Sequence, residues 1–558
     1  MRNRLLLVLL TLLPMGLWAS VRLQRQGSAT QLVVNGNPML VLGGELSNSA
    51  VTSPADIDSV MPRVRRMGLN TVFVPAYWNL TEPEEGKFDF SLVDEVIRQA
   101  RANDLKVVFL WFGAWKNSMS CYAPMWFKCD TRRFPRAMTV EGKPMEIASA
   151  FSEEVLKADC RAFTRLVKHV SDIDRQESTV IMWQIENEIG MLESARDYSP
   201  LAEKAWRGQV PDDVKRALGI KQGRGTWAQL VGTDLYAEEK FQAYYYARYV
   251  EVLSKAAKEI MDIPVYVNAA MNSRGRKPGE YPSAGPLAHL LPIWKAAAPH
   301  IDIYAPDIYD KDFKMWVGRY KRNDNPFFTP ETRMGTYSGV RAFYCFGAVD
   351  AMSFSPFAID QASPQVAREI TESYRMLSGL SPLILSHQGK EGIWGVLFSK
   401  DDQEKVLSDG NVTLTCRHYF TLPWDPRATD GSAWPEGGAL IIRLSEMEYL
   451  IAGKGVVVTF QSPTELQQTE KVVRGEDGFV EKGTSENDGA GTLSSVRSVS
   501  SRFSGKRIGI GFVNQVEVDE NGRLKYLRQE NGDQSHQGRH ARIGVDDYKI
   551  LHVKLYEY

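Results

Sequence analysis

From about residue 30 to residue 380, short apolar runs that are typical of β-strands alternate with amphipathic helical patterns. The first repeat runs from an apolar segment at 38–44, through a helix start at Ser53-Pro54, to a second apolar segment at 70–74. Parallel strands need long crossover connections, usually helices, so this alternation is typical of a parallel sheet. It predicts an α/β fold for the first two thirds of the chain.

Eight strand-like segments and about eight helical ones lie in this region. We expect strands near residues 38–44, 70–74, 106–111, 180–183, 264–267, 301–304, 326–328 and 348–354. This count matches a (β/α)8 barrel with long insertions after the third and fourth strands. A doubly wound open sheet is the alternative, but Gly43-Gly44-Glu45 lacks the G-x-G-x-x-G spacing of its phosphate turn. The last helix is predicted to start at Ser363-Pro364 and to end before Gly379.

After about residue 385 the helical periodicity disappears. β-branched runs at 439–444, 455–460 and 507–513 are separated by turn residues, among them the hairpin dipeptides Asn521-Gly522 and Asn531-Gly532. Alternation at 550–556 predicts a final strand with one buried face. We therefore expect a barrel over 21–385 and an all-β sandwich over 386–558, with the sandwich supporting the barrel and catalysing nothing.

The N-terminus indicates export. Residues 1–20 carry two arginines, an apolar stretch at 5–13 and a weak cleavage site, as in a secretory signal peptide; an uncleaved anchor is the alternative. We expect a periplasmic or secreted protein with no membrane association after cleavage. Among the five cysteines, only Cys121 and Cys129 are close enough in sequence to invite a disulfide. A net charge of −1 without a basic run argues against a nucleic-acid partner.

Carboxylates follow two of the predicted barrel strands. The fourth strand runs into Glu186-Asn187-Glu188, and the seventh runs into Glu331-Thr332-Arg333. Active sites of such barrels lie at the carboxyl ends of the strands, and a pair of carboxyl groups across that mouth is what glycoside cleavage requires. The alternative is that these carboxylates are only solvated at the strand ends and have no catalytic role. Aromatic residues make up 10% of the chain, which suits a sugar ligand as well as a large core.

Two segments resemble motifs of family 35 glycoside hydrolases, the β-galactosidases of a large retaining (β/α)8 clan. Gln184-Ile185-Glu186-Asn187-Glu188-Ile189-Gly190 resembles the Q-x-E-N-E-[YF]-G motif of that family. The stretch from Trp78 through Glu82-Pro83 and Gly86 to Phe90 resembles its W-x-x-x-E-P-x-x-G-x-[FY]-x-F block. The resemblance covers the barrel in order, and the C-terminal part resembles an accessory domain of a bacterial subgroup.

The resemblance implies roles for individual residues. Glu188 matches the general acid/base, Glu331 the nucleophile, and Asn187 the asparagine that binds the sugar 2-hydroxyl. We expect a raised pKa at Glu188 and an ionised Glu331, which Arg333 could keep charged. Glu186 is two residues before Glu188, so on an extended strand end it shares a face with it; we assign it a structural or substrate-hydroxyl role.

The sequence departs from the family where galactose is contacted. The second strand has Pro75 where better-known members have Tyr, and residues 110–117 replace an R-P-G-P-Y segment. Recognition of the sugar must be built differently, and a different glycone stays open. The replacements that we expect to contact substrate are Tyr77, Trp111, Asn117 and Tyr309, each with barrel-rim packing as the alternative.

The sequence predicts an exported retaining exo-glycosidase that releases terminal β-galactose from oligo- or polysaccharides. Bacterial relatives suggest side chains of a plant polysaccharide. No cofactor is implied, and none of the eight histidines lies in a metal-binding spacing. The alternatives are another retaining β-glycosidase of the clan, acting on glucans or mannans, and a non-catalytic carbohydrate-binding barrel. The presence of both Glu188 and Glu331 counts against the last. The oligomeric state is left open.

Overall fold

The computed structural model describes residues 20–221, 223–422, 424–467, 469–474, 480–481, 494–499, 505–519 and 521–558. The predicted signal peptide, apart from its last residue, lies outside these ranges. Every helix in the described ranges is too short or too polar to span a bilayer. A small antiparallel sheet comes first, made of β1 (Val21–Gln26), β2 (Ala29–Val34) and β3 (Asn37–Met39).

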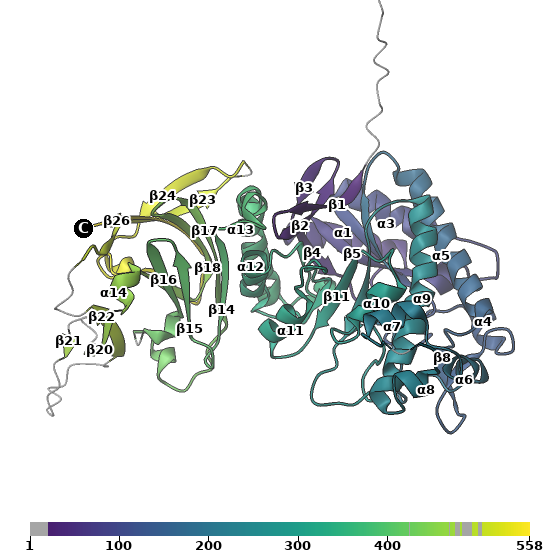
Figure 1. Ribbon diagram of the computed structural model, residues 1–558. Coiled ribbons are helices and arrows are strands. Elements are labelled where there is room, and N and C mark those ends of the chain that lie inside the picture. Colours follow the sequence, from purple (N-terminus) through teal and green to yellow (C-terminus); the bar gives the residue numbers. More distant parts are fainter. Residues whose placement is uncertain are drawn as a thin grey trace, which may run out of the picture.

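Eight parallel strands then form a near-barrel, which confirms the predicted fold class (Figure 1). In chain order they are β4 (Val41–Glu45), β5 (Thr71–Tyr77), β6 (Lys106–Phe112), β9 (Val180–Gln184), β10 (Val265–Ala270), β11 (Ile303–Ile308), β12 (Glu331–Thr332) and β13 (Ser353–Phe354). The ring closes between β12 and the segment after β13: the Thr332 amide donates to the Ser355 carbonyl at 3.0 Å, and the Phe357 amide donates to the Thr332 carbonyl at 2.9 Å.

Helices surround the strands in the expected alternation. They are α1 (Pro54–Arg66), α2 (Trp78–Thr81), α3 (Ser91–Ala102), α5 (Glu153–Asp174), α9 (Leu235–Ile260), α10 (Leu291–Ala297), α11 (Phe313–Tyr320), α12 (Ser338–Ala348) and α13 (Pro364–His387). The helix start read from Ser53-Pro54 is real, since the Ser53 side chain accepts a hydrogen bond from the Asp56 amide.

The two long insertions also lie where the sequence puts them. The insertion after β6 holds α4 (Met125–Cys129), β7 (Arg136–Met138) and β8 (Pro144–Ala148). The insertion after β9 holds α6 (Pro200–Trp206), α7 (Asp212–Ala217) and α8 (Trp227–Leu230). Cys121 and Cys129 are both free thiols.

Several predicted element boundaries are wrong. The eighth strand, expected at 348–354, is only Ser353–Phe354, and Ala348 still belongs to α12. The seventh strand is not 326–328 but the two residues Glu331–Thr332; Phe328 lies before it, and its ring packs inside the barrel against Phe73 and Tyr266. Helix α13 does not end before Gly379 but continues to His387. A Cβ at Gly379 would lie 2.4 Å from the Val518 carbonyl oxygen, so this glycine permits close packing on a C-terminal strand instead of ending the helix.

The C-terminal region is all-β, as predicted. A six-stranded antiparallel sheet has the order β14 (Ile393–Phe398), β17 (Gly437–Ser445), β18 (Glu448–Lys454), β26 (Lys549–Glu557), β23 (Ile508–Val518) and β24 (Leu524–Gln529). A four-stranded sheet has the order β15 (Glu404–Asp409), β16 (Val412–His418), β19 (Val456–Gln461) and β25 (Ala541–Ile543). Further elements are α14 (Pro463–Gln467) and the sheet of β20 (Thr469–Arg474), β21 (Val480–Glu481) and β22 (Ser494–Val499).

Strands β14, β17 and β18 of the six-stranded sheet are buried on both faces. On β17, Ala439 and Ile441 belong to the core between the two sheets, whereas Leu440 and Ile442 belong to the core that extends into the barrel. This explains why 439–442 is a continuous apolar run and not an alternating one. Figure 1 shows α12 and α13 between this sheet and the barrel strands. The division at residue 385 stays a prediction.

Glycines let α12 lie directly on the sheet. A Cβ at Gly347 would lie 2.4 Å from the Trp394 carbonyl oxygen, and a Cβ at Gly395 would lie 2.4 Å from the Tyr344 carbonyl oxygen. A nearly buried ion pair fastens the same helix, because the Arg341 guanidinium donates to both carboxylate oxygens of Glu436, at 2.8 and 2.6 Å. The sheet and the barrel are thus packed as closely as neighbouring elements of one core.

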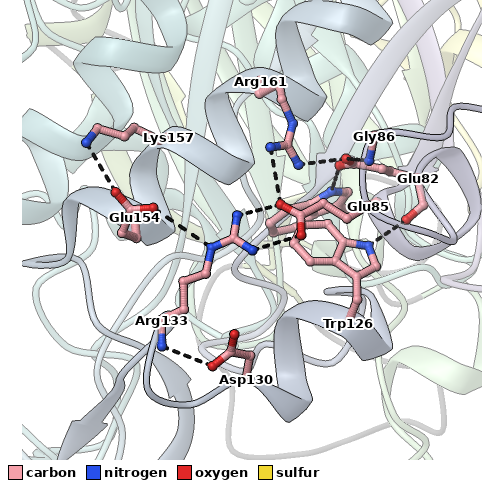
Figure 2. A network of polar contacts seen from close by, with 10 residues as sticks. Glu82, Glu85, Gly86, Trp126, Asp130, Arg133, Glu154, Lys157 and Arg161 are labelled. Atoms are coloured by element: carbon pink, nitrogen blue, oxygen red, sulfur yellow. Dashed lines mark hydrogen bonds and ion pairs between the residues drawn. The ribbon is translucent and has the colours of Figure 1, made fainter.

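The segment that resembles the W-x-x-x-E-P block is a structural hub (Figure 2). The fully buried Glu82 carboxylate accepts hydrogen bonds from the Trp78 indole at 2.9 Å, the Gly86 amide at 2.7 Å and the Arg161 guanidinium of α5 at 2.7 Å. The Trp126 indole of α4 donates to the Glu82 carbonyl at 3.0 Å. Glu82 therefore ties the chain after β5 to α5 of the barrel wall and to α4 of the insertion after β6.

We expect Glu82→Ala to lower the free energy of unfolding by about 3 kcal/mol, because it leaves a guanidinium and two N–H groups without their acceptor. Urea unfolding followed by tryptophan fluorescence measures the change. Glu84→Ala is the matched control, since Glu84 and its partner Lys87 are both largely exposed; it should cost less than about 0.5 kcal/mol. Equal losses in the two variants would contradict the role of Glu82.

Deleting residues 545–558 removes β26, an interior strand that pairs with both β18 and β23. Leu551, Val553 and Leu555 of this strand belong to the core between the sheets. We expect the truncated protein to misfold, with loss of soluble yield and of a cooperative thermal transition. An unchanged melting curve would show that the strand is dispensable.

Candidate active site

The carboxyl ends of the barrel strands bring together polar side chains that are far apart in sequence. They are Glu45 at the end of β4, Lys116 after β6, Asn187 and Glu188 after β9, Asn268 on β10, Asp307 on β11 and Glu331 on β12. All are at most 7% exposed. We call four of these residues, Glu45, Glu188, Asp307 and Glu331, together with the neighbouring cation Lys116, the carboxyl cluster.

Glu188 lies in a strained backbone conformation, with φ of +44°. Its amide donates to the Asn268 side-chain oxygen at 2.9 Å, and its carbonyl accepts from the Ser118 hydroxyl at 3.2 Å. The Asn117 side-chain amide donates to Oε2 of Glu188. Asn117, expected to contact substrate, is thus placed on the predicted acid/base itself.

Glu331 is buried beside Tyr309, whose hydroxyl donates to its Oε1, while its Oε2 has no hydrogen-bond partner among the described residues. Burial and the negative charge of Glu188 raise the pKa of Glu331 to about 7, against the opposing effects of Lys116 and the Tyr309 hydroxyl. The expectation that Glu331 is ionised stays a prediction, and this raised pKa opposes it near neutral pH.

Lys116, and not Arg333, is the cation that acts on Glu331. Its ammonium donates to the Asn187 side-chain oxygen at 2.9 Å. The Asn187 side-chain nitrogen then has no partner among the described residues and is free to donate to a ligand. Arg333 is exposed; its Nε donates to the Tyr309 carbonyl at 3.1 Å, and its guanidinium lies over the Tyr309 ring.

Glu45 and Asp307 are functional-site residues that the sequence reasoning missed. The carboxyl group of Glu45 lies within hydrogen-bonding reach of Glu331, and that of Asp307 lies within hydrogen-bonding reach of Glu188. Burial, followed by the charge of Glu331, raises the pKa of Glu45 and that of Asp307 well above the usual range. The signal that could find them is their position, because both residues lie at the carboxyl ends of barrel strands.

Two other predicted site residues point elsewhere. Glu186 has φ of +57°, which breaks the extended geometry that would place it on the face of Glu188. Its carboxyl accepts from the Trp115 amide at 2.7 Å, and burial and the neighbouring Asp159 of α5 raise its pKa well above the usual range. Trp111 donates to Asp159 at 2.8 Å, so its indole faces α5 and is not placed to contact a sugar at the cluster.

Tyr77 lies at the end of β5 with its ring 6.0 Å from that of Phe112 and 5.2 Å from that of Tyr122. Its hydroxyl is buried and has no partner among the described residues. It therefore belongs to an aromatic cluster at the rim and offers one unused hydroxyl. No group of three or more His, Cys, Asp and Glu side chains in the described ranges is arranged to hold a metal ion.

Comparison with known proteins finds similarity to glycoside hydrolases over part of the chain. Residues 52–230 match the model of glycoside hydrolase family 42, described as beta-galactosidase, and residues 370–542 match a family described as a domain of unknown function (DUF5597). A beta-galactosidase of Thermus thermophilus is 27% identical over 176 residues, which cover 30% of this chain and 25% of that protein. An exo-beta-D-glucosaminidase of Thermococcus kodakarensis is 40% identical over 63 residues, 11% of this chain and 8% of that protein.

Among solved structures, Gan42B, a GH42 beta-galactosidase from G. stearothermophilus, aligns with a TM-score of 0.47 and 15% identity; the alignment covers 62% of this chain and 57% of that one. The chain thus spans a quarter or less of the two curated relatives. A (β/α)8 barrel with paired carboxyl groups at its mouth is the framework of a glycoside hydrolase. Residues 52–230 of this chain are similar to the beta-galactosidase model. The matched model is that of family 42, whereas the motifs resemble family 35.

The raised pKa of Glu331 predicts a pH-dependent cost to stability. The unfolded chain ionises this group near 4.5 and the folded one near 7, so the folded state holds the extra proton and loses stability as pH rises between these values. At about 1.4 kcal/mol per pKa unit, the loss is roughly 3 kcal/mol. Glu331→Gln should therefore raise the free energy of unfolding, relative to the native protein, more at pH 8 than at pH 4, as measured by urea unfolding.

Glu84→Gln, which replaces an exposed carboxyl with an amide, is the control for this comparison. If Glu331→Gln shifted stability equally at pH 4 and pH 8, Glu331 would not titrate differently in the folded and unfolded states.

Proposed function

We propose that the protein is a retaining exo-glycosidase that releases terminal β-galactose from oligo- or polysaccharides. The observation that carries the proposal is the pairing of Glu188, after β9, with Glu331, on β12, close enough for the charge of one to raise the pKa of the other. The resemblance of the Gln184–Gly190 motif and the beta-galactosidase match over residues 52–230 support the choice of sugar.

The reaction proceeds by two displacements. The ionised Glu331 attacks the anomeric carbon while the Glu188 carboxyl gives its proton to the glycosidic oxygen, so that the carbon–oxygen bond breaks and a glycosyl ester forms. Glu188, now a carboxylate, takes a proton from water, and the hydroxide oxygen attacks the anomeric carbon and frees Glu331. The unpartnered Asn187 side-chain nitrogen is placed to donate to a sugar hydroxyl.

The proposal includes export, supported by the basic and apolar residues of segment 1–20. It also includes a substrate on the side chain of a plant polysaccharide, which rests on the resemblance alone. The Trp78–Phe90 and Gln184–Gly190 motifs support family 35, and the matching family model supports family 42. Both assignments predict a β-galactosidase.

A second candidate is a retaining β-glycosidase with another glycone. It is favoured by the departures at Pro75 and at 110–117, because Trp111 faces α5 and does not replace a galactose contact. The local match to an exo-beta-D-glucosaminidase adds an amino sugar to the glycones worth testing. A panel of nitrophenyl β-glycosides of galactose, glucose, mannose and glucosamine separates the two candidates.

Substitution of the two carboxyl groups tests the mechanism. Glu331→Gln should lower kcat by several powers of ten, because no glycosyl ester can form. Glu188→Ala should lower kcat/KM by about 10²–10⁴-fold for a poor leaving group and far less for dinitrophenol, which needs no proton. Steady-state kinetics on phenyl and dinitrophenyl galactosides measures both effects.

The stereochemistry of the product provides an independent check. Retention requires the two carboxyl groups to lie about 5–5.5 Å apart and the first product seen by NMR to be the β anomer. Release of the α anomer would reject the double displacement, and equal losses of Glu188→Ala on both substrates would reject Glu188 as the acid.

A further inference from the structure

We propose that Asn268 and Asp307 are positioning residues that hold the acid/base Glu188 in its working orientation. The proposal rests on the proposed function, since it concerns how Glu188 is held and not what it does. Asn268 lies on β10 and Asp307 on β11, the two strands that follow β9 around the barrel. Neither belongs to the motifs that carry the family resemblance.

The starting point is the backbone of Glu188. A glutamate at φ of +44° is strained, and it keeps this conformation only if its surroundings enforce it. The Asn268 oxygen accepts from the Glu188 amide at 2.9 Å, and the Ser118 hydroxyl donates to the Glu188 carbonyl at 3.2 Å. Backbone hydrogen bonds on both sides of the residue thus fix the direction in which its side chain leaves the strand.

Asp307 decides which way the Asn268 amide faces. The Asn268 nitrogen donates to Oδ2 of Asp307 at 2.6 Å, which turns the amide oxygen toward Glu188. If the amide flipped, an N–H group would face the Glu188 N–H and the hydrogen bond would be lost. The pair is almost completely buried, with exposed fractions of 1% for each residue, so water does not replace either contact.

The neighbouring strand supplies the matching clamp on the side chain. Asn117 follows β6 and donates to Oε2 of Glu188. Glu188 is therefore held at its amide, its carbonyl and its carboxyl by residues of β10 and of the loop after β6. Orientation matters here because proton transfer to the leaving oxygen needs hydrogen-bond geometry, and a misplacement of about 1 Å can cost about 100-fold in rate.

The test uses the leaving-group dependence of kcat/KM, which a merely structural role would not change. Asn268→Ala should lower kcat/KM on phenyl galactoside roughly 10- to 100-fold and on dinitrophenyl galactoside by less than about threefold. Asp307→Ala should show the same pattern with Asn268 still present, and it carries the test if Asn268→Ala does not fold. Asp307→Asn keeps an acceptor for Asn268 and should stay near the native pattern.

Asn325→Ala is the matched control. Asn325 is equally buried and bonds the Tyr304 amide and the carbonyls of Tyr304 and Tyr320, near the start of β11 and away from the cluster. Asn325→Ala should lower the free energy of unfolding and change kcat/KM for both substrates by the same factor. Glu188→Ala in the same assay shows whether the proposed function itself holds.

The outcomes separate the two levels of the argument. In one outcome, the loss of kcat/KM in Glu188→Ala depends on the leaving group, whereas folded Asn268→Ala and Asp307→Ala lose kcat/KM equally on both substrates. The positioning role is then overturned and the proposed function stands. If Asp307→Asn loses as selectively as Asp307→Ala, the Asp307 carboxyl acts on the neighbouring Glu188 carboxyl directly and not through Asn268, which overturns its positioning role. If Glu188→Ala shows no such dependence, the proposed function fails first.

Discussion

Four carboxyl groups and one ammonium share the buried mouth of this barrel. Glu45, Glu188, Asp307 and Glu331 come from four different strands, and Lys116 is the cation that acts against their repulsion. Burial disfavours the charged forms and raises the pKa of Glu45, Asp307 and Glu331, so these three carboxyl groups hold protons more tightly than isolated ones do. Retained protons are what a site needs if one carboxyl is to donate a proton while its neighbour attacks as an anion.

Such a cluster destabilises the folded state, and the remainder of the structure must offset that cost. The barrel closes through backbone hydrogen bonds of Thr332, directly beside Glu331. The Glu82 hub ties the chain after β5 to α4 and α5, and α12 and α13 join the barrel to a sheet whose strands β17 and β18 are buried on both faces. The C-terminal region is thus a structural part of the same core, although it contributes none of the cluster residues.

The strained conformation of Glu188 follows from the same arrangement. Neighbouring strand ends supply the contacts: β10 supplies Asn268, and the chain after β6 supplies Ser118 and Asn117. Because Glu188 is held at its backbone and at its carboxyl, the side chain has little freedom, and the entropy of orienting it is lost on folding and not during the reaction.

Much of this protein was predictable from its sequence because the relevant signals are local. The strand–helix alternation, the two insertions, the all-β C-terminal region and Glu188 and Glu331 at strand ends all follow from patterns a few residues long. Three matters depended on contacts between distant segments. Gly379 lies inside a helix and allows Val518 to pack closely against it. Trp111 and Glu186 turn toward Asp159 of α5. Glu45, Asp307 and Asn268 join the site only when the barrel closes. A sequence states which residues end a strand, but which ends meet, which way a strained residue points and which carboxyl keeps a proton are set by the tertiary packing that excludes water.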